Sequence, residues 1–369
     1  MGFFKSDERE LILENVEEVK EFALDGDPIS QFYLGIYYAN PTSDEHSMIK
    51  AFDWFLKSAE QGFESAQCNV GVCYANGLGT KQDYSKAIYW FLKAAAKNNE
   101  DGLINLGYSY YRGNGVKQDY KKAIYWYNRA VELGDSDAKF ILGLCYYNGT
   151  GTERDFEQSF RHFYSAARDG HAEACYNVAF CYENGIGVKL NNRKALEWYK
   201  RSADLGNGRA YARLGVYYFE KNSEKDAFAC FTLGAKNDNT KALYYLALCH
   251  EMGIGCKIDQ ERAFEFYKRA AKEGDEDAIY RLALCYENGV GVEEDSKLAY
   301  KYMKEASGLG HYEAVNNLFK YYLNGYGVKK DHKKAVDLLL DNLEETNYIA
   351  RYNLSMCYAT GIGVERNIE

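Results

Sequence analysis

Six histidines and ten cysteines are the residues of this chain best suited to metal or nucleophilic chemistry. A helical zinc site needs two histidines four residues apart with a carboxylate, and none of the six has that spacing. No two cysteines are separated by two residues, so zinc-finger and thioredoxin motifs are absent. The Gly-x-Ser-x-Gly nucleophile motif is absent too. The sequence therefore predicts a protein that is not an enzyme and that uses no metal or cofactor.

Paired glycines in the pattern Asn-Gly-x-Gly also suggest chemistry, because glycine-rich loops can bind phosphate. Two examples are Asn148-Gly-Thr-Gly151 and Asn288-Gly-Val-Gly291. A dinucleotide site needs Gly-x-Gly-x-x-Gly after a strand, and a P-loop needs Gly-x-x-x-x-Gly-Lys-Ser/Thr; neither is present. A glycine after the last helical turn adopts the left-handed conformation at little cost. We interpret these loops as helix stops.

The elements that carry these loops repeat every 36 residues, as Ala87, Ala123, Ser159 and Ala195 show. One helix-turn-helix unit, with a helix A and then a helix B, is written about nine and a half times. Apolar residues at positions one, five, eight and nine of each helix A predict a buried stripe. Small residues at positions one and six allow close approach of a neighbour. Position one is Ser30, Ala66, Gly102, Ala138, Ala174, Ala210, Ala242, Ala278, Ala314 or Ala350, and the helices A are expected to begin near these residues.

Each helix B follows a residue that is suited to cap it, usually an aspartate. The capping aspartates are Asp83, Asp119, Asp155, Asp259, Asp295 and Asp331. A Lys-Ala pair and an aromatic slot follow, and the slot, filled by tryptophan in four repeats, is expected to pack against other helices. His162 occupies this slot, and His250 replaces the tyrosine at position nine of a helix A. We interpret both as partly buried structural histidines.

The ends of the chain and one repeat depart from the pattern. Residues 1–27 are expected to form an amino-terminal capping helix over 7–24, residues 28–363 the solenoid, and residues 364–369 a tail. The repeat at 208–239 lacks the glycine loop and is four residues shorter. Helix A at 350–360 has no helix B after it. Tyr352, Leu354 and Tyr358 are therefore expected to be partly uncovered and to favour association.

The combined pattern Ala-x-x-x-Leu-Gly-x-x-Tyr, Asn-Gly-x-Gly-Val and Asp-x-x-Lys-Ala-x-x-Trp-Tyr-x-x-Ala-Ala resembles the Sel-1-like repeat, a relative of the tetratricopeptide repeat. Residues 66–97 match almost throughout, and the resemblance covers about residues 28–363. It implies an all-α, right-handed superhelical solenoid of antiparallel helix pairs that serves as a scaffold or adaptor. Secreted members of the family have two cysteines in each repeat. This chain mostly has one, so their disulfides are not expected.

Six of the cysteines occupy position eight of helices A: Cys73, Cys145, Cys181, Cys249, Cys285 and Cys357. Packed helix axes lie about 8–10 Å apart, whereas a disulfide needs Cα atoms about 4.4–6.8 Å apart. Equivalent cysteines of adjacent repeats should therefore not pair. We expect ten reduced thiols and a cytoplasmic location.

Position four of each helix A lies beside the buried stripe and is expected to face the concave side of the solenoid. The predicted partner-binding residues are Tyr33, Asn69, Asn105, Asn177, Arg213, Tyr245, Arg281, Asn317 and Asn353, with Ile141 in the same series. Asparagine is a poor helix former, but its amide can bind the backbone of an extended peptide. The arginines suit carboxylates and the tyrosines suit anchoring. Alternatively, these asparagines cap neighbouring loops or face water.

The predicted partners are proteins or peptides. A net charge of −9 without a basic cluster argues against nucleic acid. No apolar run approaches the roughly 18 residues of a transmembrane helix. Residues 1–6 fit the myristoylation pattern at Gly2, a short motif that leaves the modification open. The alternative function is a repeat-built hydrolase or small-ligand-binding protein, which needs a pocket with two titratable groups of shifted pKa.

Overall fold

The computed structural model describes residues 16–43, 46–343 and 347–367, and these ranges contain twenty helices and no strand. The expected all-α solenoid of repeated helix pairs is confirmed. The predicted helix start near residue 7 and the myristoylation pattern at Gly2 lie outside the described residues. The chain forms two compact units, Met1–Ala195 (unit 1) and Leu196–Glu369 (unit 2), and each is described by itself.

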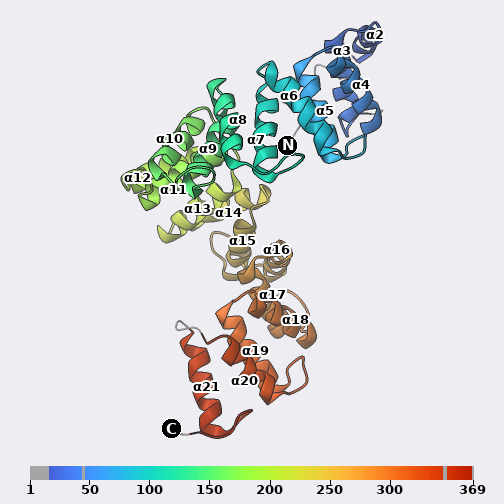
Figure 1. Ribbon diagram of the computed structural model, residues 1–369. Coiled ribbons are helices and arrows are strands. Elements are labelled where there is room, and N and C mark those ends of the chain that lie inside the picture. The colour runs from blue at the N-terminus through green and yellow to red at the C-terminus, as the bar shows by residue number, and fades with distance from the viewer. Residues whose placement is uncertain (1–15, 44–45, 344–346, 368–369) are drawn as a thin grey trace. The chain divides into compact units, whose positions relative to one another are not determined.

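Unit 1 begins with α2 (Val16–Leu24) and then alternates helices A and B (Figure 1). Its helices A are α3 (Pro28–Ala39), α5 (Glu64–Asn76), α7 (Glu100–Arg112), α9 (Ser136–Asn148) and α11 (Ala172–Asn184). Its helices B are α4 (Met48–Glu60), α6 (Tyr84–Ala96), α8 (Tyr120–Glu132) and α10 (Phe156–Arg168), while α12 (Asn192–Asp204) crosses the unit boundary. Consecutive helices from α3 to α11 pack against one another.

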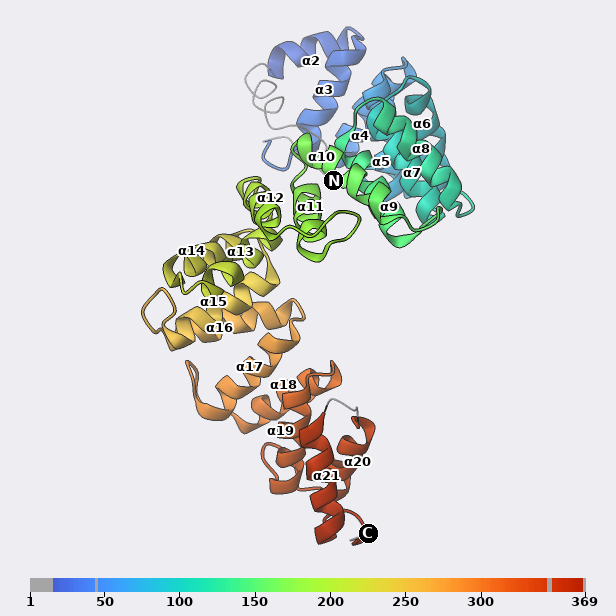
Figure 2. The same cartoon turned by 90° about the vertical axis from the view of Figure 1, so that its left-hand side faces the viewer.

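Unit 2 continues the alternation, and its helix pairs can be followed in Figure 2. Its helices A are α13 (Gly208–Glu220), α15 (Thr240–Met252), α17 (Glu276–Asn288), α19 (Tyr312–Asn324) and α21 (Tyr348–Thr360). Its helices B are α14 (Glu224–Lys236), α16 (Gln260–Lys272), α18 (Ser296–Gly308) and α20 (His332–Asp341). Again, each helix from α13 to α21 packs against the next one.

The helices A begin two residues earlier than the sequence pattern indicates. α9, for example, begins at Ser136 rather than Ala138, because the Asp135 carboxylate accepts a hydrogen bond from the Ala138 N–H at 2.6 Å. His171 and His311 have the same role, since Nδ1 of each accepts the N–H of the residue three positions on. The apolar pattern of the sequence does not indicate these N-caps. The aspartates predicted to cap helices B do so, each accepting a backbone N–H of the first turn.

Complementary side-chain sizes join helix A to helix B within a repeat. A Cβ atom built on Gly107, at position six of α7, would lie 2.4 Å from the ring of Tyr127 on α8. The small residue expected at position six therefore accommodates a ring, and Tyr127 is only 2% exposed. In the ninth repeat the large and small side chains are exchanged. Phe319 occupies position six of α19, and Leu339 of α20 occupies the position equivalent to Tyr127. Both side chains are buried.

The buried stripe is narrower than predicted. Positions one, five and eight are buried in most helices A, but the tyrosines at position nine are mostly half-buried. A lysine from the Lys-Ala pair covers the outer face of these rings. Lys86 Nζ lies 5.2 Å from the centre of the Tyr74 ring, and Lys122 Nζ lies 5.4 Å from that of Tyr110.

The second glycine of each loop joins one repeat to the preceding one. Gly289 ends α17 in the left-handed conformation with φ 66°. Two residues later, a Cβ atom on Gly291 would lie 2.1 Å from the carbonyl oxygen of Gln260 at the start of α16. Only glycine permits this approach. The shortened repeat has no such loop, because α13 and α14 are joined by residues 221–223 alone.

The last helix A has one exposed and one buried side. Tyr352 is 64% exposed and Tyr358 36%, as expected for partly uncovered residues. The prediction for Leu354 is wrong: it is 7% exposed and belongs to the hydrophobic core that also contains Leu339 of α20. Association through the exposed side of α21, and the division of the chain after residues 27 and 363, stay predictions.

Candidate partner-binding face

The side chains at position four of the helices A lie beside the buried stripe, but most are not fully exposed. Arg213 is exposed, whereas the other nine are half-buried. Position seven lies one turn further along the same side of the helix. We define the A face of each unit as the surface formed by positions four and seven of its helices A. A half-buried polar residue in this place is held by its neighbours and still reaches the surface.

Two asparagines of unit 1 keep unused hydrogen-bonding capacity. Asn105 Nδ2 donates to the carbonyl oxygen of Asp101 at 2.8 Å and lies 3.6 Å from Cys68 Sγ on α5. Its Oδ1 accepts no hydrogen bond from the described residues. Asn69 Nδ2 is buried and has no partner among the described residues. The free acceptor of Asn105 is suited to a polar group of a ligand, whereas the buried Asn69 Nδ2 is not accessible to one.

A groove opens on the A face of unit 1 between α5 and α7. Its volume is about 590 Å³. The apolar part of its lining is Val72, Ala75, Leu78, Ala87 and Phe91, and the polar part is Asn76, Tyr84, Asn105, Tyr108, Ser109 and Asn114. Of the predicted partner-binding residues, Asn105 alone lines it.

Small residues at two positions of α5 explain why the groove lies here. Position seven is Val72 and position ten is Ala75. At position ten the next three helices A have Tyr111, Tyr147 and Glu183, whose side chains are much larger. This difference is visible in the sequence, but it forms no motif and therefore does not by itself predict the groove.

Arg281, a predicted carboxylate-binding residue, already has a carboxylate partner within unit 2. Its Nη1 lies 3.6 Å from Glu251 Oε1 on α15. The Tyr267 hydroxyl on α16 donates to Glu251 Oε2 at 2.5 Å. Burial, reinforced by this hydrogen bond, raises the pKa of Tyr267, so the phenol stays protonated and acts as a donor. A carboxylate from a partner would have to compete with Glu251.

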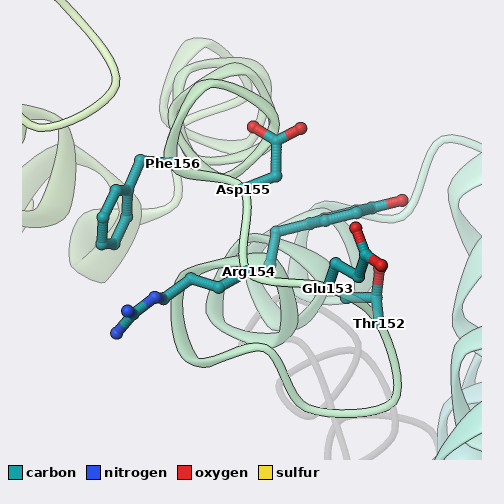
Figure 3. Close-up of a pocket in the computed structure, with 6 residues that line it drawn as sticks. Thr152, Glu153, Arg154, Asp155 and Phe156 are labelled. Carbon is teal, nitrogen blue, oxygen red and sulfur yellow. The ribbon is translucent and has the colours of Figure 1, made fainter.

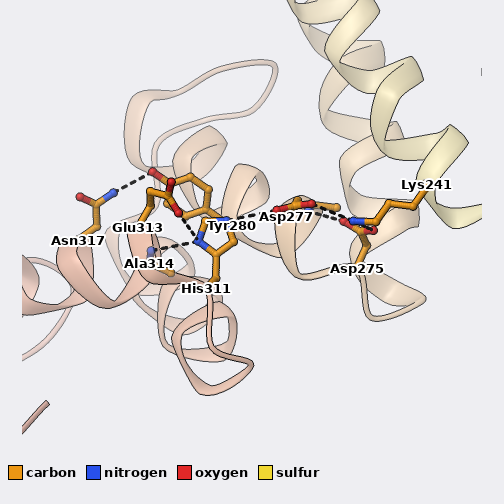
Figure 4. Close-up of polar contacts among 9 residues, drawn as sticks. Lys241, Asp275, Asp277, Tyr280, His311, Glu313, Ala314 and Asn317 are labelled. Carbon is orange, nitrogen blue, oxygen red and sulfur yellow. Dashed lines mark hydrogen bonds and ion pairs between the residues drawn. The ribbon is translucent and has the colours of Figure 1, made fainter. Parts of the chain in front are cut away.

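A chain of charged and polar contacts follows the starts of three helices A in unit 2 (Figure 4). Lys241 Nζ on α15 lies 2.9 Å from Oδ2 of both Asp275 and Asp277. His311 Nε2 lies 3.5 Å from Asp277 Oδ1, while its Nδ1 caps α19. Asp275 also caps α17 through the Ala278 N–H. Because these residues start helices and link adjacent repeats, their role is structural.

The same region holds Asn317 through its neighbours. The Tyr280 ring stacks on His311 with centroids 4.3 Å apart, and Asn317 Nδ2 donates to Tyr280 Oη at 3.2 Å. Lys320 Nζ donates to Asn317 Oδ1 at 3.3 Å. Asn317 therefore has local partners for both ends of its amide. The alternative reading of the asparagines, as residues that stabilise their surroundings, fits Asn317 better than Asn69.

A hollow of about 590 Å³ at the A–B turn of the fourth repeat does not form a catalytic site. Tyr146 and residues 152–156 line it. Figure 3 shows Arg154 extending away from Glu153, so these two side chains do not converge. The Asp155 carboxylate is occupied by the N–H groups of Glu157 and Gln158, each at 3.0 Å. Of the charged side chains that line the hollow, Arg154 and Glu153 point apart and Asp155 caps α10.

The two histidines assigned to packing positions lie among rings. His162 stacks on Tyr146 with centroids 5.4 Å apart, and His250 stacks on Phe266 at 5.6 Å. Burial lowers the pKa of both histidines, which favours the neutral imidazole. Their surroundings are those of core residues.

The ten cysteines are free thiols, and eight are buried. Burial raises the pKa of Cys73 and of Cys249 to about 12, so these thiols stay protonated and unreactive. No cluster of three His, Cys, Asp or Glu side chains suited to a metal ion occurs in the described ranges. Each helix that the structure describes is too short or too polar to span a membrane.

The Sel1 repeat family model matches nine segments of the chain: residues 28–63, 64–99, 101–135, 136–171, 172–207, 240–275, 276–311, 313–340 and 349–369. The shortened repeat at 208–239 lies between two of these matches. The predicted Sel-1-like register is therefore confirmed in nine places, and the matched segments amount to well over half of the chain.

Two solved structures resemble the chain over nearly its whole length. The protective antigen c5321 of uropathogenic Escherichia coli, which has an SLR fold, is 30% identical with a TM-score of 0.68, over 96% of this chain and 84% of that one. A Sel1 repeat protein from Oxalobacter formigenes is 27% identical with a TM-score of 0.47, over 92% and 90%. Comparison with curated protein sequences gives no match. On the repeat matches and the likeness to c5321, the chain belongs to the Sel1 repeat family.

Proposed function

We propose that this chain is a non-enzymatic scaffold or adaptor that binds protein or peptide partners through the A face of its repeats. Sel1 repeat proteins are generally protein-interaction scaffolds. The observation that carries the proposal is the groove between α5 and α7, a recess on the A face with Asn105 in its lining. Recesses with apolar walls and a few polar groups are typical of binding sites.

The proposed partner-binding residues are those at position four: Tyr33, Asn69, Asn105, Asn177, Arg213, Tyr245, Arg281, Asn317 and Asn353. The unused Oδ1 acceptor of Asn105 supports a role in binding backbone. Tyr245 stacks on Phe231 with centroids 4.9 Å apart, which fixes its ring for contact with a partner. Arg281 contributes by exchanging Glu251 for a partner carboxylate.

The polar clusters support binding rather than catalysis. The titratable groups that approach one another cap helices, as Asp155 and His311 do, or form internal pairs, as Glu251 and Arg281 do. Ten free thiols support a reducing compartment such as the cytoplasm.

The test is the double substitution Asn105→Ala with Asn177→Ala. Proteins bound by the full-length chain in an extract of the source organism are first identified by mass spectrometry. Affinity for a purified partner is then measured by calorimetry for the wild type and for the double variant. We expect weaker binding by the double variant, because two amides of the A face are lost.

Tyr89→Ala is the control, since Tyr89 is 53% exposed on α6 and lies outside the A face. Circular dichroism checks that each variant keeps its helices. If the double variant binds as tightly as the wild type while Tyr89→Ala binds more weakly, the helices B carry the interface and the proposal fails.

A further inference from the structure

The groove between α5 and α7 has an uncharged lining, which restricts the kind of group that can occupy it. None of its eleven lining residues is charged, in a chain where 27% of residues are charged. The walls and floor come from Val72, Ala75, Leu78, Ala87 and Phe91. A charged side chain placed here would lose its hydration without gaining a partner, and that transfer is costly. The groove therefore favours an uncharged, largely apolar group.

One polar atom lies ready to orient such an occupant. Because Asn105 Nδ2 is used by the Asp101 carbonyl, the amide is fixed and the free group is the Oδ1 acceptor. Ser109 Oγ cannot compete for it, since that hydroxyl donates to the backbone carbonyl of Asn105 at 2.7 Å. An unused acceptor beside an apolar recess is satisfied by a donor, such as a backbone N–H.

An apolar recess next to a backbone-binding amide fits an extended polypeptide. The side chain enters the groove and an adjacent N–H reaches Asn105. A free apolar molecule would fill the recess but would leave the acceptor without a donor.

We propose that the α5–α7 groove is the side-chain selector of the A face. It takes one uncharged aromatic or branched aliphatic side chain of an extended partner segment, and Asn105 Oδ1 accepts a backbone N–H of that segment. This inference rests on the proposed function and names the chemistry of the partner. Val72 and Ala75 determine it, because larger residues at these positions would fill the recess.

The probe is a displayed library of random linear peptides selected on the full-length protein. We expect enriched sequences to share one position occupied by Phe, Tyr, Trp, Leu, Ile or Val. Synthetic copies are then titrated against the wild type, Ala75→Tyr and Ala75→Glu. The first variant fills the groove and the second places a charge in it, so each should weaken binding by about tenfold or more, as loss of an anchoring pocket does.

Both substitutions introduce residues that the repeats already have at this position, as in Tyr111 and Glu251, so the helix should tolerate them. Ala359→Glu is the matched control, because Ala359 occupies position ten of α21 and is exposed. Its affinity should equal that of the wild type. Circular dichroism and thermal unfolding show whether each variant is folded. If one of them does not fold, Ala75→Leu takes its place, since Leu323 is the residue at position ten of α19.

The hydrogen bond to Asn105 has its own test. Single N-methylations along a selected peptide remove one N–H at a time. One of them should weaken binding to the wild type several-fold and leave binding to Asn105→Ala unchanged, because the variant has no acceptor to lose. Equal effects of that methylation on both proteins would remove Asn105 from the site.

Three results would overturn the proposal: no enrichment of any peptide, a charged residue at the shared position, or peptides that bind Ala75→Tyr and Ala75→Glu as tightly as the wild type. If peptides that bind both Ala75 variants as tightly as the wild type lose affinity for Asn317→Ala or Arg281→Ala, the scaffold function stands and the groove assignment fails. If only a free hydrophobic dye binds the groove, the occupant is a small molecule instead of a polypeptide.

Discussion

The hydroxyl group of Tyr267 gives a residue that packs in the core an additional hydrogen bond. The same ring position is Phe163 on α10 and Phe231 on α14, and both are buried. In α16 the added hydroxyl donates to Glu251, and that carboxylate faces Arg281 of the next repeat. A ring that packs within one repeat thereby also makes a polar link to the next repeat.

Tyr267→Phe should lower the free energy of unfolding by about 1–3 kcal/mol, because Glu251 loses a buried donor. The matched control is Tyr127→Phe on α8. The Tyr127 hydroxyl makes no hydrogen bond within the described ranges, so this change should stay within about 0.5 kcal/mol. Urea unfolding followed by circular dichroism measures both, and equal effects would mean that the Glu251 contact adds nothing.

Two histidines, one buried and one half-buried, should make stability depend on pH. Burial lowers the pKa of His162 and of His250 in the folded chain, whereas in the unfolded chain each titrates near about 6.5. Below that pH the unfolded chain binds more protons than the folded one, so this part of the stability is present above about pH 6.5 and is lost as the pH falls.

The double variant His162→Phe with His250→Tyr should therefore show a flatter decline between about pH 7 and pH 5. Both new residues occur at the equivalent positions of other repeats, as Phe266 in the seventh repeat and Tyr286 in the eighth. The measurement is the urea midpoint at a series of pH values. Carboxylates titrate in both proteins, so a decline of equal slope in the variant would assign the effect to them.

At the residue scale, the sequence located positions but not their partners. Helical periodicity placed Asn105 and Arg281 beside the buried stripe, where the structure has them. The links from Arg281 to Glu251 and from Asn317 to Tyr280 depend on the neighbouring repeat and on side-chain rotamers, which periodicity within one helix does not determine. The groove escaped detection for a related reason, since it follows from two small residues rather than from a motif.

At the scale of elements, the glycine loops link consecutive repeats. Gly291→Ala should destabilise unit 2 by about 2 kcal/mol or more, from a left-handed φ of 70° and from the clash with the Gln260 carbonyl. Gly308→Ala is the control, because Gly308 ends α18 with nothing near its missing Cβ. This change should be neutral or stabilise by up to about 1 kcal/mol. Thermal unfolding separates the two, and a harmless Gly291→Ala would contradict the close approach.

Helix existence and helix stops were predictable, whereas the first turns of the helices A were not. The stop signal is a single residue type, since only glycine suits the left-handed end of α17. The start signal varies: Asp135, His171 and Asn239 all cap helices A with a side-chain acceptor. An apolar stripe indicates the buried part of a helix but does not include a polar first turn. The predicted starts of the helices A are therefore two residues late.

At the scale of the whole molecule, each unit has cores of its own. One hydrophobic cluster of unit 2 runs from Ala227 to Cys357, and two clusters of unit 1 lie between Ala23 and Leu142. Repeats in a solenoid contact only their neighbours, so distant parts can unfold separately.

We therefore expect urea unfolding in more than one step. Trp54, Trp90 and Trp126 lie in unit 1, and Trp198 is the one tryptophan of unit 2. Tryptophan fluorescence thus reports mainly on unit 1, and circular dichroism reports on all helices. The two transitions should have different midpoints. Superimposable curves from both signals would show that the chain unfolds as one cooperative block.

The recurrence of cysteine at position eight gives the chain its own set of local stability reporters. Cys73, Cys145, Cys181, Cys249, Cys285 and Cys357 are each at most 4% exposed, so a thiol reagent reaches them only when the surrounding repeat opens. The labelling rate of each cysteine, read by peptide mass spectrometry, therefore measures the opening free energy of one repeat in the native protein. Without a single substitution, stability can be mapped at these six repeats, and a bound partner would appear as a local slowing of labelling in those that it holds closed.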